Sequence, residues 1–511
     1  MNELTKTSQP VFTKTATEGS ITFKHLKLDD FEVVQILAVQ LKQAMNEHNT
    51  LYVRALLNDE QGKQYENQIS QKKLVLRAQE QILFQGLVTD LRIAFKAGSY
   101  ELEIHGISYS YLLDMTPNSR SFQDVKMTYE ALMQTVMATY AGKIMDNSSN
   151  KATIDGLVLQ YLETDWQFLK RLASHFNTGL ICDSRFEQPM IHFGVAPTQA
   201  LELTQFNYQV SKAVKLYQLL VKNGVQGLSE ADFLRYEITT NQVANVGDRV
   251  KFLEQEFHVL NCLSQVEQGI FTTQLVLSPL KGFAKLYQQH HEAAGCSFAG
   301  RVIDVQNTEV RVHLEMDPDQ PVDTACWFAY STVYSSADGS GFYCMPELGD
   351  QVRLYVPDGQ NHHAYVISSI HEPVATDEAN QQLPDYDLAE LADDEQTPQN
   401  AIAPGGLRND PDVKSFRNAT GQEIRLTPAG VYIIAEGSVI TLTETNGIKI
   451  QSENDIEFHA EKNLLLAAQE DVKIIGMQGV TLDAKEASIC LDEDVRISGQ
   501  EIMSNGGADD E

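Results

Sequence analysis

Residues 423–486 divide without a gap into eight octads: EIRLTPAG, VYIIAEGS, VITLTETN, GIKIQSEN, DIEFHAEK, NLLLAAQE, DVKIIGMQ and GVTLDAKE. The second and fourth positions of every octad are apolar, a regularity that identifies an internal repeat. These positions are Ile424, Leu426, Tyr432, Ile434, Ile440, Leu442, Ile448, Ile450, Ile456, Phe458, Leu464, Leu466, Val472, Ile474, Val480 and Leu482.

The spacing within each octad predicts β-structure. Apolar residues two apart follow the period of a strand, and the last three positions hold mostly small or polar residues that suit a turn. We therefore expect a strand of about five residues and a tight corner per octad, stacked as a β-solenoid with the apolar positions inside. Eight residues cannot close a turn with three faces. Either one chain supplies three octads per turn or three chains supply one face each, and the pattern does not choose between them.

Length and charge limit the remaining possibilities. The 511 residues predict two to four domains. The net charge of −31 argues against nucleic acid or an anionic lipid surface as a partner, because both would be repelled. Six cysteines without a CxxC pair indicate reduced, structural thiols. We expect no secretory signal and no transmembrane helix, and hence a cytoplasmic protein, because the N-terminus lacks an apolar core and no apolar run is long enough.

The first 290 residues predict two domains of mixed α+β and all-β structure. Residues 1–115 form a β-rich, barrel-like domain with strands at 20–28, 31–41, 51–57, 73–79 and 82–95 and a turn at Gly98-Ser99. Residues 116–290 form an α+β domain with helices at 128–140 and 165–176 and strands at 180–182, 190–195 and through 205–280. In the second helix we expect Trp166, Leu169 and Leu172 to face inward and Lys170 and Arg171 to face outward.

The next 80 residues predict a small barrel. Within 291–373, strands at 298–306, 309–316, 325–331, 350–356 and 363–370 fit an OB-fold. The basic and aromatic groove that binds single-stranded nucleic acid is missing from this stretch. An acidic linker at 374–412 follows, and residues 413–511 form the repeat domain. The repeat is lost at 487–511, so its tip is expected to need a separate cap.

Four segments resemble one known family. They are Phe84-Gln85-Gly86, SRSFQ at 119–123, YLETDWQFLKRL at 161–172 and GFYCMPELGDQV at 341–352. The first three are similar to the hub of VgrG proteins and of the late-control tail proteins of contractile phages. The fourth is similar to the OB domain of the spike in that family. The first 60 residues show little of the family pattern.

The resemblance implies a function. In this family the protein is a homotrimer whose hub caps an inner tube of Hcp-like protein and contacts baseplate proteins. An intertwined three-chain β-helix punctures the target envelope to deliver effectors, with a PAAR-like protein capping its tip. The resemblance therefore favours the three-chain alternative for the octads. It also implies a cytoplasmic protein that leaves the cell with the injection apparatus, as in type VI secretion or a phage tail.

The sequence shows no catalytic, cofactor or metal site. His290-His291 with Glu292, and His362-His363 with Asp358, are candidate metal ligands, but neither pair forms a recognisable set, and Asp393-Asp394-Glu395 suits a solvated run. No nucleophile elbow, zinc-protease or phosphate-loop motif occurs. The alternative is a β-solenoid adhesin or enzyme acting on polysaccharide. It needs outward carboxylate pairs or aromatic stripes, which Glu453, Asp455 and Glu457 and the outward positions Arg425, Thr441, Lys449, Lys473 and Thr481 do not supply.

Overall fold

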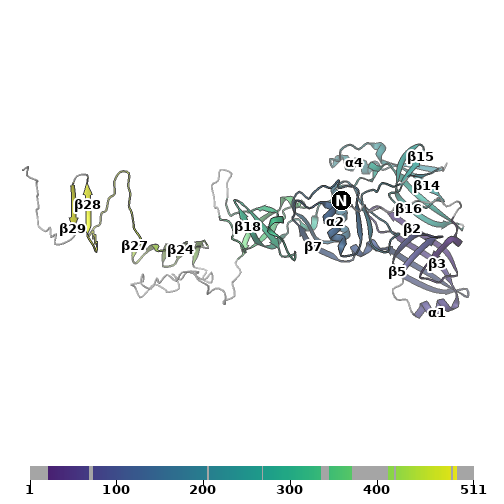
Figure 1. The fold of residues 1–511 in the computed structure, drawn as a ribbon, viewed down its shortest axis with the longest axis horizontal. Helices are drawn as coiled ribbons and strands as arrows, with labels where there is room; N and C mark the ends of the chain where they lie inside the picture. Colours follow the sequence, from purple (N-terminus) through teal and green to yellow (C-terminus); the bar gives the residue numbers. More distant parts are fainter. Residues whose placement is uncertain are drawn as a thin grey trace, which may run out of the picture. The chain divides into compact units, whose positions relative to one another are not determined.

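The structure is a computed structural model that describes residues 21–67, 73–198, 200–203, 207–267, 269–334, 344–370, 413–418, 420, 422–484 and 487–491. The chain divides into two compact units, residues 1–373 and 374–511, which are treated separately below. The fold is mostly β with an OB domain and several sheets (Figure 1). No helix among the described residues is long and apolar enough to cross a membrane.

A twelve-stranded sheet occupies much of the first unit. Its main path runs through β1 (Leu26–Leu28), β4 (Lys73–Ala78), β5 (Gln81–Lys96), β6 (Ser99–Ser108), β3 (Thr50–Leu57), β2 (Gln35–Ala44), β16 (Gln255–Glu267), β17 (Ile270–Ser278), β14 (Leu234–Thr240) and β13 (Tyr208–Lys212). Off this path, β15 (Arg249–Phe252) pairs with β16, and β12 (Leu201–Glu202) pairs with β15. Strands β2 and β16, far apart in sequence, lie side by side (Figure 1). This pairing joins the N-terminal strands to those after residue 200.

Most N-terminal strand predictions are confirmed. Strands β3, β4 and β5 match the predicted segments, and the β5–β6 turn has positive φ at Ala97 and at Gly98. The strand expected at 20–28 is shorter, since a 3-10 turn at Phe23–His25 precedes β1. Helix α1 (Asp59–Asn67), which lies against β3, β5 and β6, was not predicted, although Asp59 and Glu60 in its first turn suit a helix N-terminus.

Two capped helices build the core of the next segment. In α2 (Tyr129–Ala138) the Thr128 side chain accepts a hydrogen bond from the Ala131 amide. In α3 (Asp165–His175) Thr164 and Gln167 form a capping box. The predicted inward residues of α3 are buried. Small sheets flank these helices: β7 (Pro117–Phe122) with β9 (Val158–Thr164), and β10 (Leu180–Cys182), β11 (Met190–Phe193) and β8 (Lys143–Asp146).

Two predictions in this segment are wrong. Arg171 is buried, because its guanidinium pairs with Glu163 at 2.8 Å and donates to the Leu159 carbonyl at 2.6 Å. A polarity pattern cannot reveal a charge that is fully paired inside. Strands were expected throughout 205–280, but helix α4 (Val214–Lys222) interrupts them and packs Leu220 against Phe233.

All five strands predicted for the OB domain are confirmed. Its sheet runs β20 (Trp327–Ala329), β19 (Glu309–Leu314), β18 (Ser297–Gln306), β21 (Gln351–Tyr355) and β22 (Tyr365–Ile370). The interior is apolar and contains two residues from outside the barrel, Leu157 and Leu159. Short 3-10 turns elsewhere in the unit span Tyr109–Asp114, Glu230–Phe233, Leu280–Phe283, His291–Ala293, Val322–Thr324 and Asn361–His363.

The second unit contains the octads, while the expected linker at 374–412 lies outside the described residues. A five-stranded antiparallel sheet runs in chain order through β23 (Lys414–Arg417), β24 (Glu423–Thr427), β25 (Gly430–Ala435), β26 (Ser438–Thr443) and β27 (Gly447–Ser452), and β28 (Val480–Ala484) pairs with β29 (Ala487–Leu491). Strands are thus confirmed for octads one to four and eight. Residues 453–479 carry none, and their apolar side chains are exposed. The closed β-helix stays a prediction.

Candidate functional site

One face of the octad sheet is apolar across all five strands. The register places Ile424, Ile433, Ile440 and Ile450 in one cross-strand row and Leu426, Val431, Leu442 and Ile448 in the next. Residues directly opposite each other share a face of the sheet, and Phe416 extends the first row onto β23. These nine residues are called the octad face: Phe416, Ile424, Leu426, Val431, Ile433, Ile440, Leu442, Ile448 and Ile450.

The octad face is largely open to solvent in a single chain. Ile448 is 71% exposed and Leu426 is 49% exposed. Of the sixteen predicted interior positions, Tyr432 is buried and three are half-buried, Ile434, Ile440 and Val480. The other twelve are exposed: Ile424, Leu426, Leu442, Ile448, Ile450, Ile456, Phe458, Leu464, Leu466, Val472, Ile474 and Leu482. An exposed, continuous apolar surface of this kind marks an interaction site.

The second octad presents different positions from its neighbours. Tyr432 and Ile434 lie on the opposite side from the octad face, and Val431 and Ile433 take their places. The cause is the length of the loops. Across the two-residue loops at 428–429 and 436–437, residues that lie opposite each other are an odd number of positions apart in sequence. Equivalent octad positions are eight apart, an even number, so they fall on opposite faces of neighbouring strands. The sequence held a signal for these missed residues, since the run VYII is apolar on both faces of a strand.

The opposite side of the sheet holds a buried ion pair. Arg425 donates two hydrogen bonds to Glu423, at 2.8 Å and 2.6 Å, and both side chains are almost fully buried. The prediction that Arg425 points to solvent is therefore wrong. Its bidentate partner is Glu423, and Tyr432 lies directly across on β25. Glu457, named for the polysaccharide alternative, pairs with His459 at 3.1 Å and with no second carboxylate among the described octads.

The candidate metal ligands do not converge. The Nε2 of His290 lies 3.1 Å from the Tyr161 carbonyl, in the interior of the first unit. His363 pairs with Asp358 at 2.8 Å on the surface, and its ring contacts that of His362. Within the described ranges no group of three or more His, Cys, Asp or Glu side chains is arranged to hold a metal ion. Residues 393–395 lie outside those ranges.

One cluster of histidine, serine and aspartate side chains lies largely inside the first unit. The His48 ring lies 2.8 Å from the Ser110 Oγ and 3.3 Å from the Asp114 carboxylate. Ser110 is only 2% exposed, and its oxygen also bonds Ser108 and Cys182. Burial lowers the pKa of His48. Because Ser110 is buried, these hydrogen bonds hold its side chain within the core.

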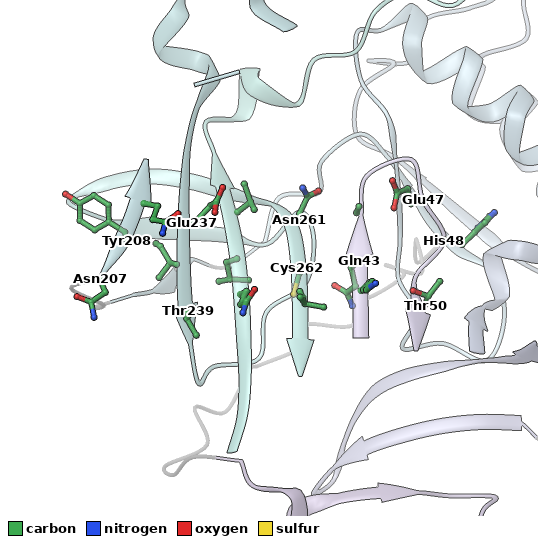
Figure 2. A pocket seen from close by; sticks show the side chains of 18 residues that line it. Gln43, Glu47, His48, Thr50, Asn207, Tyr208, Glu237, Thr239, Asn261 and Cys262 are labelled. Carbon is green, nitrogen blue, oxygen red and sulfur yellow. The ribbon is translucent and has the colours of Figure 1, made fainter. Parts of the chain in front are cut away.

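A hollow of about 1180 Å³ is lined mainly by strands β2, β13, β14, β16 and β17 of the twelve-stranded sheet. Figure 2 shows its labelled side chains, among them Glu47, Glu237 and Asn261, spread along several strands rather than converging on one point. Cys262 is one of the lining residues. It is buried, and its sulfur donates to the Ala244 carbonyl. The hollow is therefore a concave surface with a mixed polar and apolar lining.

The comparison with protein families places the OB domain. Residues 298–371 match the family model described as the type VI secretion system/phage-baseplate injector OB domain. No curated protein matches the chain. The family match coincides with the five-stranded barrel and ends where β22 ends.

Several solved structures are similar to the chain. The c3393 protein of E. coli, described as a type VI secretion component similar to the T4 bacteriophage tail proteins gp27 and gp5, is 13% identical and covers 68% of this chain and 99% of its own, with a TM-score of 0.48. The 43 kDa tail protein of prophage MuSo2 from Shewanella oneidensis is 13% identical over 52% of this chain and 98% of its own, with a TM-score of 0.40. The lidded Francisella PdpA–VgrG complex is 8% identical over 82% of this chain and 76% of its own, with a TM-score of 0.47.

The OB match defines the class: the chain carries an injector OB domain of the type VI secretion and phage-baseplate kind. The resemblance to VgrG-type spikes and phage tail hub proteins, first seen in the sequence, is confirmed. A structural role in a baseplate or spike is supported.

Proposed function

We propose that this chain is a non-enzymatic hub and spike of a contractile injection system, which caps the inner tube, punctures a target envelope and delivers effectors. One observation carries the proposal. An injector OB domain is followed in the same chain by a repeat whose apolar residues a single chain leaves in water. Such a surface is stable only when other chains cover it.

The repeat closes as a trimer in this proposal. Each chain contributes one face of an intertwined β-helix, and the apolar octad positions of three chains meet along its axis. Burial of each Ile, Leu or Val side chain contributes about 1.5–3 kcal/mol, so the closed rod resists unfolding under load. The antiparallel sheet of β23–β27 is then the single-chain arrangement of a segment that becomes a rod in the assembly.

The remaining parts take the roles that the resemblance implies. The domains before the OB barrel form the hub, which binds an Hcp-like inner-tube protein and baseplate proteins. The end of the repeat binds a PAAR-like tip protein and effectors. The protein stays in the cytoplasm until assembly and is then ejected with the apparatus. The net charge of −31 supports protein partners over nucleic acid, because phosphates would be repelled.

Electron microscopy of the purified full-length protein tests this proposal. The expected particle is a threefold body with one thin stalk, since three hub regions surround one shared rod. A variant truncated after residue 412 is the matched control and should keep the OB domain and lose the stalk. Single, separate particles without threefold symmetry at micromolar concentration would contradict the proposal.

A further inference from the structure

The SRSFQ segment at 119–123 lies at the boundary between the α2–α3 region and the OB domain, and Figure 1 shows β7 between α2 and the OB strand β18. Its residues alternate in direction, as expected of a strand. Arg120 donates to Asp165 at 2.6 Å, and Phe122 stacks on Phe168 in the helical core. Ser121 and Gln123, the residues that follow Arg120 and Phe122, contact the OB domain instead.

Ser121 binds one OB carboxylate twice. Its backbone amide donates to Asp317 at 2.7 Å and its hydroxyl donates to the same carboxylate at 2.5 Å. Asp317 is only 8% exposed, and its carbonyl lies 2.9 Å from the His313 ring. Burial raises the pKa of Asp317, and the two Ser121 bonds oppose that shift. A buried carboxylate held by two donors is a strong contact at low dielectric.

Gln123 fastens two further OB segments. Its side-chain amide nitrogen donates to the Val312 carbonyl on β19 at 3.2 Å. Its side-chain oxygen accepts from the Cys326 amide at 3.2 Å, and its carbonyl accepts from the Cys326 thiol at 2.8 Å. Gln123 is 2% exposed, so each of these groups would be costly to leave unpaired.

Apolar contacts cross the same boundary. Leu157 and Leu159, from the start of β9, belong to the core of the OB domain. The Tyr161 ring packs edge-on against Phe298 of β18, with 4.9 Å between the ring centres. The OB interior is thus completed by side chains from the preceding domain.

We infer that Ser121, Gln123 and Asp317 form a clasp that makes the α2–α3 region and the OB domain move and unfold as one body. The clasp assigns a role to the SRSFQ segment. The clasp would also transmit force from the hub to the OB domain, because it leaves no hinge between them. This mechanical consequence rests on the proposed function. The coupling itself rests only on the contacts within residues 117–328.

Hydrogen exchange of the full-length protein tests the clasp. In the unaltered protein the slowest amides of β18, β19, α2 and α3 should exchange at one common rate, because both regions open together. In Ser121→Ala and in Asp317→Asn the β18 and β19 amides should exchange about tenfold faster than those of α3, since one or two buried hydrogen bonds are lost.

Ser119→Ala is the matched control. It lies two residues earlier on the same strand, and its oxygen accepts from the Leu162 amide of β9, at 3.3 Å, so it should leave the OB rates unchanged. The double variant Ser121→Ala/Asp317→Asn should be less affected than the two single effects combined, because they share one contact.

Separate slowest rates for the two regions in the unaltered protein would overturn the inference, even if a variant fails to fold. Equal effects of Ser119→Ala and Ser121→Ala would also overturn it. Sedimentation measured on the same samples separates the two proposals. A single-chain mass with a common exchange rate contradicts the trimer alone, whereas a trimer mass with separate rates contradicts the clasp alone.

Discussion

The OB sheet and the octad sheet are both five-stranded, antiparallel and built from alternating apolar residues, yet they treat those residues in opposite ways. In the OB domain Val310, Val312 and Leu354 are fully buried. In the octad sheet Ile448 is 71% exposed. The OB sheet curls around its own interior, whereas the described residues leave most of the octad face exposed. The OB fold is therefore complete in a single chain, whereas we propose that the octad fold becomes complete only in an assembly.

The largest effect is expected from Ile448→Asn. In the assembly three copies of an unpaired amide would enter the apolar interior, so chains should fail to associate at micromolar concentration. The OB and hub transitions should not change, because Ile448 makes little contact in the single chain. Light scattering of the full-length variant measures the effect.

Lys449→Asn is the control for this experiment. The residue adjoins Ile448 but faces the other side of the sheet, across from Thr441, so association should persist. Loss of association in both variants would show that the strand, and not its apolar face, carries the contact.

A smaller effect is expected from Leu314→Ala in the OB domain. Leu314 is fully buried by its own chain, and truncation of such a residue lowers the free energy of unfolding by about 2–5 kcal/mol. The loss should be the same at every protein concentration, in contrast to the octad variant. Urea denaturation over a hundredfold concentration range measures it.

Leu348→Ala provides the comparison. Leu348 is 70% exposed, so this substitution should lower the free energy of unfolding by less than about 0.5 kcal/mol. A concentration-dependent loss in Leu314→Ala would mean that the OB domain also depends on other chains.

The smallest expected effect is a loss of stability of the first unit at acidic pH. Burial, helped by Arg171, lowers the pKa of His175 from 6.5 to about 4. Above pH 6.5 neither the folded nor the unfolded chain binds this proton, so stability is unaffected. Between pH 6.5 and about 4 the unfolded chain binds this proton and the folded chain does not. The free energy of unfolding of the first unit should therefore fall by about 2–3 kcal/mol over this range. Below that window His175 adds no further loss.

His175→Gln should flatten the acid dependence of the thermal midpoint between pH 6.5 and 4. His459→Gln should not, because its side chain is 86% exposed in the octad stretch. Unchanged acid dependence in His175→Gln would assign the loss to other groups.

The sequence predicted most where local pattern decides the outcome. Period-two spacing located the five OB strands and the first four octad strands, and Thr164 located the start of α3. Prediction from the sequence failed where a residue's burial or pairing depends on groups that are distant in the chain or on a charged partner. The burial of Arg171 depends on Glu163, that of Arg425 on its bidentate partner, and the β2–β16 pairing joins segments about 200 residues apart.

Loop length explains the remaining difference at the candidate site. The octad period correctly marks apolar positions, but it cannot state which face each one occupies once strands fold back on each other. Two two-residue loops exchange Tyr432 and Ile434 for Val431 and Ile433 on the octad face. A repeat that winds in one direction around a rod has no such reversals, so the second and fourth octad positions would again align there.

Sedimentation equilibrium of the full-length protein tests the central claim most directly, since that claim is that other chains cover the octad face. The account predicts a mass three times that of the 57.1 kDa chain across the micromolar range. A mass of 57.1 kDa, independent of concentration, would contradict it.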